Sequence, residues 1–190
     1  MTTPTHALAQ LVRLARYNAW AYARLLAAAD ALPDVHYRAH AGLAFRSVHG
    51  TLCHLLVSDA VWLNRLRGEH DQAAALGRYW HEGDMYAAAD SPSVPWEDIE
   101  PDRTALRRRL LDQANDFVAF LESLPADTDP EGPFSYRTTS GTARTKPLAV
   151  VIAHIVNHGT HHRGQASAAV TRFGLAPPSM DLIYWEYEDE

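Results

Sequence analysis

The chain has 190 residues, of which 47% are hydrophobic and 21% are charged, and its formal net charge is −6 with neutral histidines. This length and composition predict one globular domain over residues 1–190 and exclude an intrinsically disordered chain. The acidic balance argues against a nucleic-acid partner, which needs a basic surface, and the lack of an apolar run of ~20 residues argues against a membrane partner.

Two helices are predicted in the first third of the chain. Apolar residues recur at intervals of three and four from about Thr5 to Ala29, which gives a helix with one apolar face. Pro33 ends this helix, because the residue before a proline is pushed away from helical geometry. Ser47 is a good cap for a second helix, which reaches about Arg67 and is stopped by Gly68.

The segment Glu69–Pro101 breaks this periodicity. Glycine, proline, aspartate and aromatic residues are mixed in it, as in Arg78-Tyr79-Trp80. We therefore predict a long connection that contains a short helix. Such a connection inside a compact domain often forms a lid or a side wall of a functional site.

The remaining sequence predicts two more long helices, at about Asp102–Ser123 and Pro147–Phe173. Between them, an alternating pattern over Phe134–Thr145 around a Ser-Gly pair indicates a short hairpin. Helical spacing in Met180–Tyr187 predicts a short final helix. The predicted fold class is therefore all-α, a four-helix bundle with a long crossover connection and a short C-terminal helix.

The compartment is predicted from the cysteine content and the first residues. Cys53 is the only cysteine, so no intramolecular disulfide can form. The first residues lack a basic stretch followed by an apolar one, so we expect no signal peptide. Both features favour a cytoplasmic protein.

Histidines are concentrated in the last long helix. His158 and His162 are four residues apart, so their rings lie one turn above each other on the same face, and His154 continues this row. His161 is rotated off it. Two ligands from one helix bind a metal weakly, and His54, which lies among apolar residues of the second predicted helix, is a candidate third ligand.

A metal would explain these histidines, but a simpler interpretation exists. A lone His54 is more often a satisfied core histidine, and histidine pairs four apart occur by chance in a histidine-rich chain. His49 lies about 140° around the helix from His54 and Cys53 about 100°, so neither should share its ion. Neutral imidazoles bind zinc, nickel, copper and ferrous iron.

Three widely separated segments of the sequence carry a further pattern. They are Tyr17-Asn18-Ala19-Trp20-Ala21 with Arg24-Leu25-Leu26, then Ser47 through Leu56 with Asp59 and Trp62-Leu63, and finally His154 through Gln165, trailed by Gly174, Pro177-Pro178 and Asp181. In order and spacing they resemble the DinB-like superfamily, metal-dependent four-helix bundles that are named for damage-inducible expression and include thiol-dependent S-transferases. The resemblance implies one histidine ligand from the second helix and two from the H-x-x-x-H-R-G-Q motif, which here are His54, His158 and His162.

The resemblance also implies a function. One divalent transition metal ion, with zinc or nickel as the first candidates, would leave a coordination position open beside three histidines. The leading hypothesis is a transferase that adds a low-molecular-weight thiol to a small electrophile, with the ion holding the thiol as its nucleophilic thiolate. The expected partners are that thiol, the electrophile and, because relatives are often dimers, a second copy of the chain.

Two other functions stay open at this point: a metal-assisted hydrolase, and a non-enzymatic metal-binding or stress-related protein whose ion is structural. A helical interaction domain without metal is the alternative to all three. Glu69–Pro101 and Met180–Tyr187 are the predicted pocket walls, and Asp59 is a candidate to orient a ligand histidine. Gly164 is expected to let a neighbouring helix approach closely, and Arg163 to pair with an acidic residue.

Overall fold

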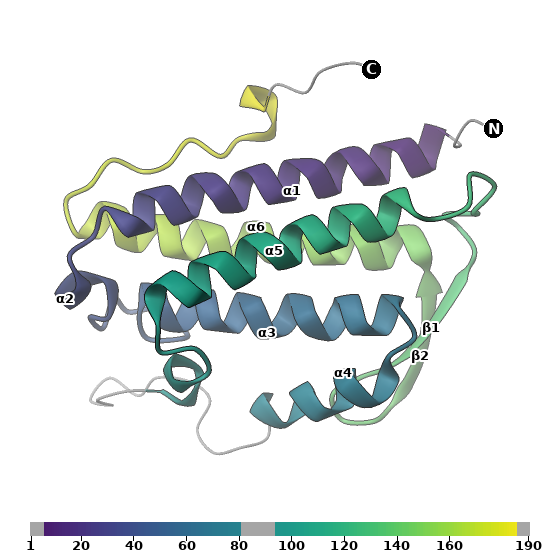
Figure 1. The fold of residues 1–190 in the computed structure, drawn as a ribbon, viewed down its shortest axis with the longest axis horizontal. Helices are drawn as coiled ribbons and strands as arrows, with labels where there is room; N and C mark the ends of the chain where they lie inside the picture. The colour runs from purple at the N-terminus through teal and green to yellow at the C-terminus, as the bar shows by residue number, and fades with distance from the viewer. Residues whose placement is uncertain (1–5, 81–93, 186–190) are drawn as a thin grey trace.

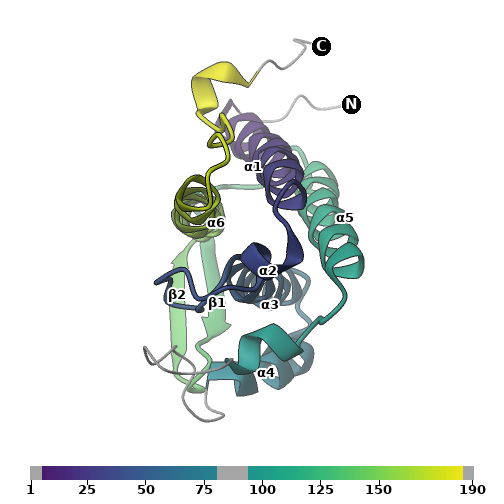
Figure 2. The ribbon, with the colours of Figure 1, turned by 90° about the vertical axis from the view of Figure 1, so that its left-hand side faces the viewer.

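The fold is known from a computed structural model, which describes residues 6–80 and 94–185. Each of the four long helices packs against two of the others, so that they form a ring in the order α1, α5, α3, α6 (Figure 2). The predicted four-helix bundle is confirmed. Its helices are α1 (His6–Asp30), α3 (Val48–Leu66), α5 (Arg103–Glu122) and α6 (Leu148–Arg172).

The ends of the long helices lie where the sequence predicts them. The Ser47 side chain accepts a hydrogen bond from the Gly50 amide at 3.0 Å and so caps α3. Asp102 caps α5 in the same way, through the Ala105 amide at 2.6 Å. Gly174, with φ at 88°, follows the C-terminal end of α6. The side-chain oxygens of Ser47 and Asp102 thus satisfy backbone amides that the first turn of each helix leaves unpaired.

Short elements connect the long helices (Figure 1). The predicted hairpin is present as β1 (Pro133–Arg137) paired antiparallel with β2 (Ala143–Pro147). The predicted final helix is a single 3₁₀ turn, η3 (Leu182–Tyr184), and Tyr187 lies outside the described residues. A short helix that the sequence did not reveal, α2 (Asp34–Tyr37), follows α1. The long connection contains α4 (His70–Gly77), η1 (Arg78–Trp80) and η2 (Pro95–Asp98). Residues 81–93 of this connection are not described.

The core has three clusters of buried side chains. Two of them run along the bundle axis between the long helices. The third lies outside the bundle, where Phe45, Val57 and Val61 pack with Val94 and Trp96 of the connection. This third cluster matters most for the site, because it places an aromatic wall beside the middle of α3. Within the described residues, none of the helices combines the length and the apolar character needed to cross a bilayer.

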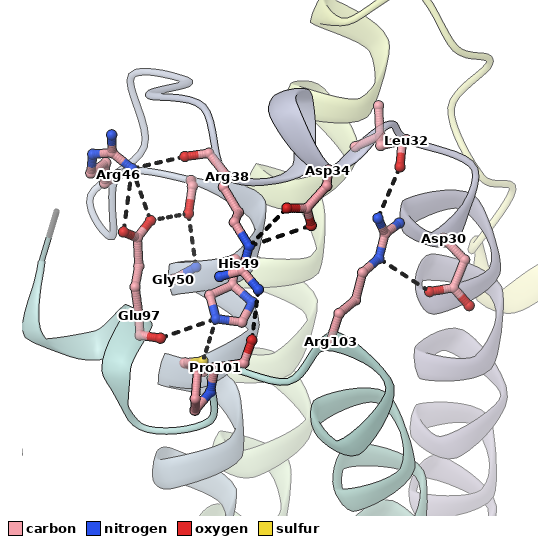
Figure 3. Close-up of polar contacts among 12 residues, drawn as sticks. Asp30, Leu32, Asp34, Arg38, Arg46, His49, Gly50, Glu97, Pro101 and Arg103 are labelled. Atoms are coloured by element: carbon pink, nitrogen blue, oxygen red, sulfur yellow. Dashed lines mark hydrogen bonds and ion pairs between the residues drawn. The ribbon is translucent and has the colours of Figure 1, made fainter. Parts of the chain in front are cut away.

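Polar contacts hold the end of the connection against the start of α3 (Figure 3). The Glu97 carboxylate accepts hydrogen bonds from Ser47 and, at 3.1 Å, from Arg46, and both side chains of this ion pair are largely buried. The backbone carbonyl of Glu97 lies 3.1 Å from Nε2 of His49. Arg38 donates to the carbonyl of Pro101 at 2.6 Å. These contacts fix η2, and with it Trp96, over the face of α3.

Candidate metal centre

Three histidine side chains meet between α3 and α6. One ring nitrogen from each of His54, His158 and His162 lies within 4.8 Å of the corresponding atoms of the other two. The Nε2 atoms of His54 and His158 are 3.4 Å apart, and the ring centroid of His162 is 4.5 Å from each of the other two centroids. The structure therefore brings together the three side chains that the sequence singled out.

The separation of two of these nitrogens fits a shared ion. Two nitrogens bound to one tetrahedral zinc at ~2.0–2.1 Å are ~3.3–3.4 Å apart, which matches the separation of the two Nε2 atoms. Nδ1 of His54 and Nδ1 of His158 are fully buried and have no hydrogen-bond partner among the described residues. Burying such poorly satisfied rings is unfavourable unless something else compensates. A cation held between their Nε2 atoms is such a compensation.

The environment keeps these rings neutral, which is the form that binds metal. Burial, and then the nearby His162 and His158, lower the pKa of His54 to about 2. Burial, followed by His162, lowers the pKa of His158 to about 3. Burial also lowers the pKa of His162, and its hydrogen bond with Gln165 opposes this shift. At neutral pH no proton has to leave before these nitrogens can coordinate an ion.

An aromatic shell encloses His54. The Phe45 ring stacks on the His54 ring at 3.8 Å between centroids with an interplanar angle of 13°. Trp96 meets the same ring edge-on at 4.8 Å, and Trp80 at 5.9 Å. Gly50 permits this arrangement, because a Cβ at that position would lie 2.1 Å from the Phe45 carbonyl oxygen. The shell fixes the imidazole plane and keeps water from that side of the site.

One polar side chain, Gln165, orients a ligand histidine, and the sequence analysis assigned it no role. Nδ1 of His162 donates to Oε1 of Gln165 at 2.8 Å, while the Gln165 amide nitrogen lies 3.2 Å from Nε2 of His161. The hydrogen bond with Gln165 fixes the tautomer of His162 and leaves its Nε2 free for a metal. Ser58 Oγ lies 3.2 Å from Nε2 of His54, the nitrogen that would bind the ion, so this hydroxyl borders the ion position and does not orient the ring. The spacing of three residues between His162 and Gln165 on one helix was the available signal.

Replacing Gln165 with leucine should weaken metal binding. Loss of an acceptor that orients a ligand histidine typically reduces metal affinity ~10–100-fold. The affinity is measured by competition with a chromophoric chelator. Gln165→Glu, which keeps an acceptor at this position, should bind within a few-fold of the wild type. Equal affinities for Gln165→Leu and wild type would show that the hydrogen bond plays no part.

The comparisons with known proteins agree with this geometry. The model of the DinB family matches residues 1–190. The chain belongs to the DinB family. It is 26% identical over 170 residues to Protein DinB of Bacillus subtilis (strain 168), an alignment that covers 89% of each chain. No solved structure shows significant similarity.

The other candidate residues of this DinB-family chain lie elsewhere. His49 faces the connection, where its Nε2 contacts the Glu97 carbonyl, so its exclusion from the ligand set is consistent with the structure. Cys53 is buried in the bundle core, and burial raises the pKa of its thiol to about 12. The prediction that Asp59 orients a ligand histidine is wrong, because its carboxylate accepts a hydrogen bond from Tyr22 at 2.6 Å instead.

Asp59 should make the stability of this protein depend on pH. Burial raises the pKa of Asp59 to about 6, although the Tyr22 hydrogen bond and the charge of Arg163 oppose the shift. Its folded-state pKa lies above the ~3.9 of an unfolded chain, so the folded state holds the proton more tightly. The resulting stability is present below pH ~4 and is lost as the pH rises through ~6.

Asp59→Asn, which cannot ionise, should therefore be more stable than the wild type at pH ~8 by about 1–3 kcal/mol. The difference should disappear near pH ~4. Urea unfolding of both proteins at several pH values measures it. A difference that is constant with pH would contradict the burial of a charged carboxylate at this position.

A cavity of about 260 Å³ opens beside the histidines. His54 and His158 line it together with Trp80 of the long connection and Thr139 of the hairpin. The expectation that the long connection supplies a wall therefore holds for its described part. The prediction for the C-terminal tail is wrong over Met180–Trp185, because this segment packs on α1, where Tyr17 donates to the Met180 carbonyl at 2.8 Å.

Proposed function

We propose that the protein is a divalent-metal-dependent transferase that joins a low-molecular-weight thiol to a small electrophile. The observation that carries this proposal is a buried set of three histidines that borders a cavity of about 260 Å³. Structural zinc sites are usually closed by four protein ligands, whereas catalytic sites keep a position open. Among the described residues, the cluster that could hold an ion has three members.

The residues of the chain have defined parts in this reaction. His54, His158 and His162 would hold the ion, and Gln165 keeps Nε2 of His162 turned toward it. Phe45, Trp80 and Trp96 exclude water from one side and leave the cavity as the approach. When bound, a divalent ion lowers the pKa of a thiol or a water at its open position.

The proposed step balances without a further reactant. The thiol loses its proton to solvent through the cavity, and its sulfur forms a bond to the electrophilic carbon. The leaving group departs with the electron pair of the bond that breaks. No oxidant or reductant is involved.

Incubating metal-loaded protein with cellular thiols and chlorodinitrobenzene tests the proposal. The conjugate is quantified by mass spectrometry, with metal-free protein and His162→Ala as controls. We expect conjugate only with loaded wild-type protein. Absence of conjugate with every thiol would overturn the proposal, and turnover without thiol would identify the metal-assisted hydrolase in its place.

We also propose a location and partners for this protein, of which the small-molecule partners are the thiol and the electrophile. Thiols stay reduced in the cytoplasm, and we propose that location. The net charge of −6 offers no attraction for nucleic acid. We also propose a homodimer, which light scattering of the purified protein would detect.

A further inference from the structure

Arg65, near the end of α3, is a buried cation that has no acidic partner among the residues that the structure describes. Its residue is only 6% exposed, and its guanidinium forms no hydrogen bond or ion pair among the described residues. By contrast, Arg67, two residues further along, is exposed and pairs with Asp116 at 3.3 Å. Burial lowers the pKa of Arg65, because removal from water disfavours the charged guanidinium. A buried charge without a partner is unfavourable, so its retention requires an explanation.

Two aromatic rings hold the guanidinium in place. It lies 4.5 Å from the centroid of the Trp62 ring and 5.4 Å from that of Tyr136 on β1. These rings contact each other edge-on at 5.1 Å. Stacking against an aromatic face leaves the in-plane N–H donors of arginine free for a ligand. The nitrogens of Arg65 are not among the described side-chain atoms that are both fully buried and unpaired, so they keep some contact with solvent.

Arg65 and the histidines line the same cavity. Its lining includes His54 and His158 together with Trp62, Arg65 and His154. His54 and Arg65 are eleven residues apart on α3, a rise of ~16 Å between their Cα atoms. Burial and the charge of Arg65 both lower the pKa of His154, which is consistent with a neutral His154. Of the described residues that line this cavity, Arg65 alone carries a fixed charge.

We propose that Arg65 binds a carboxylate on the small molecule that reaches the three histidines, so that the substrate is a carboxylate-bearing thiol. The thiol part rests on the proposed function. A carboxylate matches the two-pronged donor geometry of arginine. One arginine balances one negative charge, which favours a carboxylate over a doubly charged phosphate. Asp71, which lines a second cavity beside Arg65, forms no ion pair with it among the described contacts.

The test compares pairs of thiols that differ only at their far end. Cobalt-loaded protein is titrated with mercaptopropionate, mercaptohexanoate and mercapto-octanoate, and with mercapto-alcohols of the same chain lengths. The charge-transfer absorption of the cobalt–sulfur bond reports binding without any need for turnover. We expect the acid to bind at least ~10-fold more tightly than the alcohol at the length that spans the cavity.

Arg65→Gln should lose this preference while its affinity for the alcohols stays unchanged. Arg67→Gln is the matched control, because it removes a cation from the same helix outside the cavity, and it should keep the preference. If Arg65→Gln does not fold by circular dichroism, Arg65→Lys replaces it. Arg65→Lys keeps the positive charge but lacks the two-pronged donor. Its preference for the mercapto-acids over the mercapto-alcohols should be smaller than that of the wild type.

The inference is overturned if the Arg65 variant prefers acids as strongly as the wild type does, which would leave Arg65 as a clamp between α3 and the hairpin. The proposed function fails separately, if no thiol gives the absorption band. In that case calorimetry with hexanoate and octanoate decides the inference. Weaker binding to Arg65→Gln than to Arg67→Gln supports it, and equal or absent binding to both overturns it.

Discussion

Replacing His54 or His162 with alanine is expected to reduce bound metal from about one ion per chain to a small fraction of that value. Each change removes one of three ligands and leaves two, and two imidazoles bind a divalent ion weakly. The loss of affinity should exceed the ~10–100-fold that follows removal of an orienting neighbour. Elemental analysis of untagged protein, purified with equal amounts of metal, measures the ion content.

Two other histidines of the same helices provide the controls. His49 is on α3 but contacts the Glu97 carbonyl, and His161 is on α6 but is exposed and contacts Gln165. His49→Ala and His161→Ala should therefore retain close to the wild-type metal content. Equal content in the wild type, His54→Ala and His162→Ala would remove the site as described.

The ligand set was predictable from the sequence to different degrees. His158 and His162 lie on one face of α6 because the helix itself places residues four apart together. That relation is local and needs no knowledge of the fold. His54 is different, because its approach to α6 depends on how α3 packs in the bundle. Only the resemblance to a family could select it over other core histidines.

The surroundings of the site were less accessible to sequence reasoning. Phe45 stacks on His54 from a loop, and Trp96 reaches the same ring from a segment some forty residues away along the chain. Such contacts depend on long-range packing that periodicity does not encode. The tail was misplaced for a related reason, since an apolar spacing does not say which helix it will cover. The long helices were predicted well because caps and apolar faces are local features.

The two glycines of the last long helix are predicted to respond in opposite ways to alanine. At Gly159, a Cβ would lie 2.6 Å from the Arg163 guanidinium and 3.0 Å from Oδ1 of Asn18. These two atoms belong to a buried hydrogen bond, because Arg163 is 1% exposed and donates to Asn18 on α1. Gly159, and not Gly164 as the sequence predicts, therefore permits the close approach of α1.

The buried guanidinium has little freedom to move away from a new methyl group. Arg163 also donates to Thr160 at 3.1 Å and lies 4.9 Å from the centroid of the Tyr22 ring. Its hydrogen bonds go to neutral partners, and the acid that interacts with it electrostatically is Asp59. A shift large enough to admit the methyl group would break a charge-assisted hydrogen bond, which contributes about 1.5–3 kcal/mol.

Gly159→Ala should accordingly destabilise the metal-free protein by about 0.5–2 kcal/mol, even after the gain in helix propensity of about 1 kcal/mol. Gly164 has no atom within 4 Å of its added Cβ and is exposed, so Gly164→Ala should gain that propensity and stabilise the protein by about 0.5–1 kcal/mol. Both free energies of unfolding come from urea titrations in the presence of a chelator. If the two variants changed stability equally, helix propensity alone would explain them, and the Arg163–Asn18 contact would not constrain the packing of α6 on α1.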